Sequence, residues 1–228
     1  MKLNWIILCG MTLASSQVWS AEQTVLKTDK DKLSYSIGAS IGKNLRKESS
    51  DIDLELLIQG MKASMAGDKV LLSDKDIGQI MNDYQMKLRK TAMLNRQQAL
   101  VENKKKGDAF LAEFQAKKGV SALPGGVLYS VIKEGKGKKP LSTDAIEVYY
   151  SGSLINGKQF DATEPGHPAI LKVASLINGW KQALTSMPTG SKWHIVIPSQ
   201  LAYGERGAGN DIGPNEVLVF DVELVSIK

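Results

Sequence analysis

The chain has 228 residues, enough for one large domain or two small ones, and its 43% hydrophobic and 23% charged residues are ordinary for a globular protein. Its formal net charge of +5 comes from scattered basic residues, with local runs only at Lys104–Lys106 and Lys136–Lys139. Because neither run is interleaved with aromatic residues, nucleic-acid binding is not expected.

The first twenty residues are typical of an export signal. A basic residue is followed by an apolar stretch from Leu3 to about Leu13 and then by small residues. This stretch is shorter than the about 20 residues that a transmembrane helix requires. We therefore expect residues 1–20 to be a signal peptide cleaved after Ser20. Cys9, the only cysteine, lies within it, so the exported chain would be stabilised by packing and not by disulfides.

The segment that follows predicts an all-helical region, because it contains no proline up to residue 122. The sequence Thr28–Asp31 (T-D-K-D) resembles a capping box, so a helix should begin near Asp29. A second helix is predicted between Asp53 as N-cap and Gly67 as stop signal. Together these helices define a helical region at residues 21–72.

A long helix is predicted next. The sequence Ser73–Asp76 (S-D-K-D) is a start signal, and a helix from 74 to about 117 would be about 65 Å long at 1.5 Å per residue. Because residues 95–106 are largely polar, this half has no apolar face to bury and should stand in solvent as a rod, with Gly107 as a weak point. We assign residues 73–122 to this connecting helix.

The helical region is small for a core of its own, and oligomerisation often compensates for such a size. Five methionines gather in this part of the chain: Met61, Met65, Met81, Met86 and Met93. They are either ordinary core residues or a methionine-rich dimer interface, since methionine adapts to irregular contacts. The size of the core favours the second interpretation, so we expect a homodimer formed through the N-terminal helices.

All seven prolines lie after residue 122, together with most of the glycines, and predict a β-rich domain at 123–228. It opens with the turn Leu123–Gly126 (L-P-G-G). Asn156-Gly157 is a strong hairpin signal, and the segment Leu176–Met187 is long enough for one short helix. Strands are expected at 127–132, 145–150, 154–155, 192–198 and 216–227. The sum is an α+β fold, with a curved antiparallel sheet wrapped on one short helix.

Aromatic residues recur in this domain where a turn meets an apolar run: Tyr150, Phe160, Trp180, Tyr203 and Phe220. Two carboxylates, Asp161 and Asp221, lie close to them in sequence. The stretch contains no cysteine, no recognisable Ser/His/Asp set and no metal-ligand spacing. This combination predicts an apolar, aromatic-lined pocket with one or two polar groups, and neither a metal nor a cofactor is expected.

Each of these residues also has a structural interpretation. Trp180 could be a core residue, as large aromatic residues usually are. Asp161 could belong to a turn or a cap, and Tyr150 and Tyr203 could bond only to backbone. The two histidines, His167 and His194, are interpreted as structural.

Five motifs in order resemble the FK506-binding peptidyl-prolyl isomerases over about residues 125–228. They are V-Y-Y-S-G (148–152), F-D (160–161), L-I-N-G-W (176–180), A-Y-G (202–204) and L-V-F-D-V-E-L (218–224). The order of export signal, helical dimerisation region, long helix and C-terminal isomerase domain is similar to the macrophage infectivity potentiator type of Gram-negative bacteria.

This resemblance implies roles for individual residues. Trp180 would form the floor of the proline pocket, while the backbone N–H of Ile177 and the hydroxyl of Tyr203 would bind peptide carbonyls. Asp161 would lie at the rim beside the Tyr150 hydroxyl. The side chains that the resemblance places around the bound peptide are Tyr150, Phe160, Leu171, Leu176, Ile177, Ile212 and Phe220. The loops depart from the common pattern at Ala169 and at 207–211.

The resemblance also implies an activity and partners. It implies cis–trans isomerisation of X-Pro bonds in exported or envelope proteins, in the periplasm or at the outer membrane or cell surface. It further implies binding of X-Pro polypeptides and of macrolide inhibitors such as FK506 and rapamycin. Two alternatives stay open: a holdase-type chaperone that grips unfolded chains between two rods, and a cell-surface interaction protein that uses the isomerase fold as a binding module.

Overall fold

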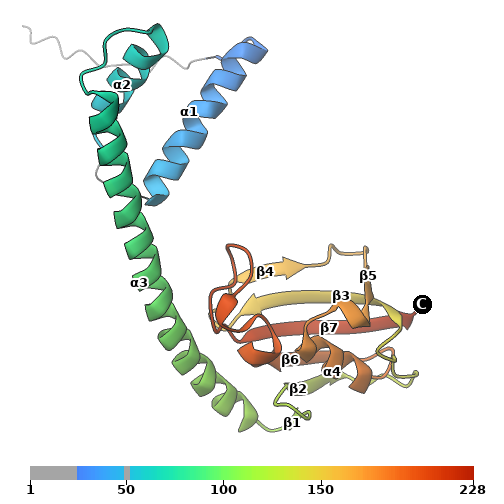
Figure 1. The fold of residues 1–228 in the computed structure, drawn as a ribbon. Coiled ribbons are helices and arrows are strands. Elements are labelled where there is room, and N and C mark those ends of the chain that lie inside the picture. The colour runs from blue at the N-terminus through green and yellow to red at the C-terminus, as the bar shows by residue number, and fades with distance from the viewer. Residues whose placement is uncertain (1–24, 49–51) are drawn as a thin grey trace, which may run out of the picture. The chain divides into compact units, whose positions relative to one another are not determined.

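The computed structural model of the chain describes residues 25–48 and 52–228, so the expected signal peptide at 1–20 lies outside the described residues. The described residues divide into two compact units, one that ends at Asp76 and one from Ile77 to Lys228; Figure 1 shows the helices and strands of both. Within the described ranges, no helix is both long enough and apolar enough to cross a membrane.

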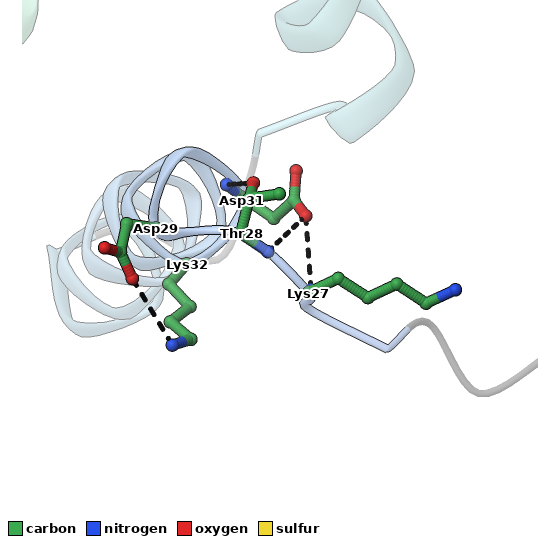
Figure 2. A network of polar contacts seen from close by, with 5 residues as sticks. All are labelled: Lys27, Thr28, Asp29, Asp31 and Lys32. Carbon is green, nitrogen blue, oxygen red and sulfur yellow. Dashed lines mark hydrogen bonds and ion pairs between the residues drawn. The ribbon is translucent and has the colours of Figure 1, made fainter.

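The first unit contains α1 (Asp29–Glu48), which begins where the capping box predicts. The Asp31 carboxylate accepts hydrogen bonds from the backbone N–H groups of Thr28 and Lys27 at 2.9 and 3.2 Å, and the Thr28 hydroxyl accepts one from the Asp31 N–H at 3.1 Å (Figure 2). The bond from the Thr28 backbone lowers the pKa of Asp31 below its usual value. This reciprocal pairing satisfies N–H groups that the first turn of a helix leaves without partners.

The second helix, α2 (Leu54–Ala66), also has the predicted boundaries. The Asp53 carboxylate accepts hydrogen bonds from the N–H groups of Glu55 and Leu56 at 2.9 and 3.1 Å. The helix ends at Gly67, whose φ of 72° is the left-handed conformation that favours glycine at a C-terminus. None of the residues of α2 is buried.

The second unit is built on one antiparallel sheet with the strand order β1-β2-β6-β7-β3-β4, and β5 pairs with β3 (Figure 1). The strands are β1 (Val120–Ala122), β2 (Leu128–Lys133), β3 (Ala145–Leu154), β4 (Gln159–Ala162), β5 (Ala169–Lys172), β6 (Lys192–Ile197) and β7 (Leu218–Ile227). The 3₁₀ helices are η1 (Val173–Ser175), η2 (Ser199–Leu201) and η3 (Gly204–Arg206). Alternate residues along β3 and β7 are buried, which is the period of two expected for strands with one face on a core.

One helix, α4 (Asn178–Ser186), covers the inner face of this sheet, as predicted (Figure 1). Trp180, Ala183 and Leu184 are its buried side chains in the main core. Gly179 brings the first turn close to the sheet, because a Cβ atom at this position would overlap the side chain of Ile197 in β6. A glycine here therefore sets the distance between α4 and the sheet.

The long helix α3 (Asp74–Gln115) has nearly the predicted length, but its last turns do not stand free in solvent. Gly107 and Phe114 are buried. Phe114 packs with Val196 and Val217 of the sheet domain in a second small core. A Cβ at Gly107 would lie 2.7 Å from Cγ2 of Val217, so this glycine is a point of close approach and not a weak point. The prediction that this half of α3 stands free in solvent was therefore wrong. Around Gly107 the helix contacts the sheet domain through a glycine and polar groups, so the sequence shows no apolar stripe there.

Four features of the sheet were not predicted. The strands β1, β4 and β5 have only three or four residues, too few to show a clear alternation. In addition, β3 continues without interruption through Ser151 and Gly152, where two separate strands were expected. The turn at Asn156-Gly157 was predicted correctly: Gly157 has φ 83°, and its N–H donates to the Leu154 carbonyl at 2.9 Å.

We predict that Ile197→Ala lowers the free energy of unfolding of the sheet domain by about 2–5 kcal/mol, because it leaves a cavity beneath α4. The matched control is Ile132→Ala in β2, where the side chain is 55% exposed and the change should be within about 0.5 kcal/mol. Urea unfolding followed by the fluorescence of Trp180 and Trp193 measures both. Equal effects of the two substitutions would contradict the assignment of the core.

Candidate active site

Four aromatic rings in the sheet domain form a continuous edge-to-face cluster. The Trp180 ring lies 5.3 Å from the Tyr150 ring and 5.2 Å from the Phe220 ring, each at an interplanar angle of 88°. Phe160 lies 5.7 Å from Phe220 at 87°. Such perpendicular pairs are the favoured arrangement of aromatic quadrupoles. Trp180 and Phe220 are each 5% exposed, whereas Tyr150 and Phe160 are half-buried, so the first pair lies deeper in the domain and the second nearer to its surface.

The sheet register explains why two of these rings can meet. Gly152 of β3 lies directly opposite Phe220 of β7. A Cβ atom at Gly152 would lie 2.6 Å from Cε1 of Phe220 and 2.9 Å from Cε2 of Phe160. The absent side chain therefore leaves the space in which the two phenylalanine rings pack. No role for Gly152 was predicted from the sequence, although a glycine inside a strand pattern often marks the close approach of another group.

A β-bulge brings two neighbouring residues of β4 to the same site. Asp161 pairs with Gly152 and Gln159 pairs with Ser153, so Phe160 is the extra residue between them. Successive residues of a regular strand point to opposite faces, but a bulge re-aims one of them. Asp161 can therefore reach the Tyr150 hydroxyl while Phe160 packs in the aromatic cluster.

The remaining predicted apolar residues pack against the same core. Ile212 is buried and 9% exposed, and the half-buried side chains in contact with the core include Leu171, Leu176 and Ile177. Ile177 occupies the N-cap position of α4. Its backbone N–H has no acceptor among the residues that the structure describes, which leaves it free for an outside carbonyl.

The polar part of the site is a hydrogen-bonded pair. The Tyr150 hydroxyl donates to Oδ2 of Asp161 at 2.7 Å. Burial, followed by the hydrogen bond and charge of Asp161, raises the pKa of Tyr150 to about 12, so the phenol keeps its proton at neutral pH. The charge of Tyr203 is the smallest of the causes that raise the pKa of Tyr150. Tyr203 itself is 41% exposed and stands apart from the apolar cluster.

Comparisons with known proteins show the family of the chain. The family model described as the domain amino terminal to FKBP-type peptidyl-prolyl isomerase matches residues 30–131, and the FKBP-type peptidyl-prolyl cis-trans isomerase model matches residues 136–225. The outer membrane protein MIP of Legionella longbeachae is 42% identical, over 100% of this chain and 99% of that protein. The chain belongs to the FKBP-type peptidyl-prolyl cis-trans isomerases.

Solved structures of such isomerases support the assignment. The crystal structure of FkpA from Escherichia coli matches with a TM-score of 0.66 at 34% identity, over 90% of this chain and 99% of that chain. A peptidyl-prolyl cis-trans isomerase from Pseudomonas syringae pv. tomato matches with a TM-score of 0.53 at 42% identity, over 56% of this chain and 94% of that chain. The predicted family, enzyme class and α+β fold are thereby confirmed.

Asp221 and His194, which the sequence also singled out, make their contacts outside the aromatic cluster of the isomerase domain. Asp221 follows Phe220 in β7, so its side chain is on the opposite face, where it lies 2.6 Å from Nδ1 of His194. The His194 ring lies 5.4 Å from that of Phe114 in α3. His167 is exposed in a loop. Among the described residues, no cluster of three or more His, Cys, Asp or Glu side chains could hold a metal ion.

We predict that Asp161→Asn lowers the pKa of Tyr150 from about 12 toward, but not down to, its ordinary value of 10.0, because burial is its largest cause. Since folding raises this pKa, the stabilising effect of the neutral phenol is complete below pH 10 and is lost as the pH rises to about 12. Ultraviolet titration of tyrosinate measures the shift. Asp221→Asn is the control, and Tyr150→Phe should abolish the most alkaline step. An unchanged titration in Asp161→Asn would contradict the pairing.

Proposed function

We propose that this isomerase assists the folding of exported polypeptides by binding the proline of an X-Pro sequence against Trp180, within the rings of Tyr150, Phe160 and Phe220. The observation that carries the proposal is the edge-to-face cluster itself, in which a buried indole is surrounded by half-buried apolar side chains. The wall of this pocket is completed by Leu171, Leu176, Ile177 and Ile212.

The chemistry requires no bond to be made or broken in the backbone. Amide resonance opposes rotation about the X–Pro bond with a barrier of about 18–20 kcal/mol, so uncatalysed exchange takes roughly 10–100 s. A rate gain of about 10⁵ requires a barrier lower by some 7 kcal/mol, at 1.36 kcal/mol per factor of ten. An apolar pocket contributes because it removes the water that stabilises the charge-separated planar amide, which has more charge separation than the twisted one.

Hydrogen-bond donors around the pocket would hold the twisted peptide. The Ile177 N–H lies at the N-terminus of α4, where backbone donors are left without helical partners. The partly exposed Tyr203 hydroxyl would bind the second carbonyl. The Tyr150 hydroxyl is already engaged by Asp161, so this pair fixes the ring of Tyr150 at the rim. Donors aimed in advance at the twisted geometry need no reorganisation during rotation.

We place the protein in the envelope of a Gram-negative bacterium, either in the periplasm or at the outer membrane. The expected export signal supports this, as does the similarity to a protein named outer membrane protein MIP. The clients would be exported X-Pro polypeptides. Macrolides such as FK506 and rapamycin would compete for the same pocket, because their binding is implied by the family.

The first unit supports homodimerisation through the N-terminal helices. A groove of about 730 Å³, here called the N-terminal groove, is lined by Gly38, Ile41, Gly42, Leu45, Arg46, Ile52, Leu54, Leu57, Ile58 and Met61. Neither Gly38 nor Gly42 has another atom within 4 Å of the position of a Cβ. Both glycines therefore leave room for the close approach of a second helix. Large apolar surfaces that stay exposed in one chain commonly mark interfaces.

A second candidate function, holding unfolded chains, is favoured by apolar side chains beyond the groove. Met86 and Met93 of α3 are 60% and 62% exposed. Methionine adapts to varied apolar partners. Suppression of the aggregation of a proline-free client would measure this activity separately from isomerisation.

We predict that Trp180→Leu lowers kcat/KM for a short X-Pro peptide by at least about tenfold, equivalent to about 1.4 kcal/mol of transition-state stabilisation. Trp193→Leu is the matched control, because Trp193 is also 5% exposed but stacks on Tyr129, outside the pocket. Tyr203→Phe, compared with Tyr149→Phe, tests the hydroxyl alone. A proline-exchange assay by NMR, with and without a macrolide, provides the rates, and equal losses in both members of a pair would refute the proposed site.

We predict that the full-length chain sediments at twice the monomer mass and that deletion of residues 21–72 gives monomers. The truncated chain should still isomerise short peptides, since every pocket residue lies after residue 147. Ile41→Asp, within the N-terminal groove, should shift the equilibrium toward monomers, whereas Leu141→Asp at an exposed site of the sheet domain should not. Sedimentation velocity measures all four chains, and a monomeric full-length protein would contradict the dimer.

A further inference from the structure

The polar half of α3 carries a row of residues that contacts the segment 204–217, which we call the η3 loop. The residues of this row are spaced i, i+4, i+7 and i+11 and so lie on one face of the helix: Arg96, Leu100, Asn103 and Gly107. The η3 loop begins directly after Tyr203 and contains Ile212, so it joins α3 to two residues of the proposed proline pocket.

Two amide side chains make the central contacts. Nδ2 of Asn103 donates to the carbonyl of Pro214 at 2.9 Å, and Nδ2 of Asn215 donates to the carbonyl of Leu100 at 3.1 Å. Both bonds are partly buried, and one donor comes from each side of the contact. Loss of either donor would leave a carbonyl with one partner fewer in a place where water has limited access.

Two further contacts extend the row. Nη2 of Arg96 donates to the carbonyl of Glu205 at 2.8 Å, at the beginning of the loop. At the other end, Gly107 lies against Val217, with only 2.7 Å between the position of a Cβ and Cγ2 of Val217. The helix therefore contacts the loop near its start and along its return to β7.

The η3 loop is closed by backbone hydrogen bonds of its own. Its base is closed by the Asn215 N–H, which donates to the Gly204 carbonyl at 2.8 Å. Ala208 and Ile212 exchange two backbone bonds of 2.9 and 3.1 Å. Asn215 has φ 57°, a left-handed conformation that asparagine tolerates better than most residues.

The tip of the loop has a weaker attachment. Nζ of Lys158, in the turn between β3 and β4, lies 2.8 Å from Oδ1 of Asp211, and both side chains are more than half exposed at 52% and 58%. Exposed ion pairs of this kind contribute little. The partly buried bonds to α3 therefore provide the stronger attachment.

We propose that Asn103 and Asn215 are positioning residues, which join α3 to the base of the η3 loop and so hold Tyr203 and Ile212 at the proline pocket. The connecting helix thus sets the affinity of the isomerase for its substrate without touching the substrate. This inference rests on the proposed site and deepens it, because it assigns a role to residues outside the pocket.

The test uses the full-length chain with Asn103→Leu, which has a similar size but no donor, and Asn215→Gly, which keeps the left-handed backbone accessible. Each variant should raise KM for a short X-Pro peptide by about two- to tenfold, the effect of one net hydrogen bond, with kcat unchanged. Asn103→Gln retains an amide donor and should recover part of the affinity. Glu113→Gln is the matched control: the exposed Glu113 side chain pairs with Lys117, just beyond the end of α3, so this substitution should leave KM unchanged.

The outcomes separate this inference from the proposed function. The positioning role is overturned if the wild-type chain isomerises the peptide and KM is unchanged in Asn103→Leu, in Asn215→Gly and in their double variant. A fall in kcat that follows the loss of melting temperature, without a change in KM, would overturn it too, since general loosening would explain that result. A wild-type chain that does not isomerise X-Pro peptides would instead overturn the proposed function.

Discussion

The contact between the indole of Trp180 and the rings of Tyr150 and Phe220 is the interaction on which the sheet domain and its site both depend. Trp180 comes from α4, whereas the other two rings come from β3 and β7, so the contact joins the helix to the sheet. The floor of the proposed pocket is therefore also part of the main core. A site that acts through its shape and through the exclusion of water requires rigid side chains around it, and a close-packed core provides them.

The helices and turns that depend on local signals were predictable from the sequence. Thr28 and Asp31 cap α1, Asp53 and Gly67 bound α2, and Gly157 forms the hairpin turn, because each acts on backbone groups within a few residues. The short strands β1 and β5 were not predictable in this way. Their pairing with β2 and β3 is decided by partners far along the chain, and three or four residues cannot display a period.

The candidate site likewise contains features that were predictable from the sequence and features that were not. The resemblance to a family indicated which residues belong together, but the residues alone could not separate Asp161 from Asp221, since each follows a phenylalanine. Strand geometry separates them: Asp221 takes the ordinary alternate face, whereas the bulge at Phe160 turns Asp161 toward Tyr150. A bulge is a property of the pairing between two strands, so the sequence pattern of β4 alone does not predict it.

The docking of α3 was missed for a related physical reason, and that reason bears on how the helix acts. Hydrophobic periodicity detects faces that bury apolar side chains, but the face from Arg96 to Gly107 makes its contacts through amide and guanidinium donors and a bare backbone. Each such bond contributes only about 0.5–1.5 kcal/mol net. The apolar packing of Phe114 with Val196 and Val217 lies further along the same helix and buries all three side chains. The helix is thus anchored firmly at its C-terminal end and only weakly beside the η3 loop, so small changes along its polar face can adjust the loop without undocking the helix.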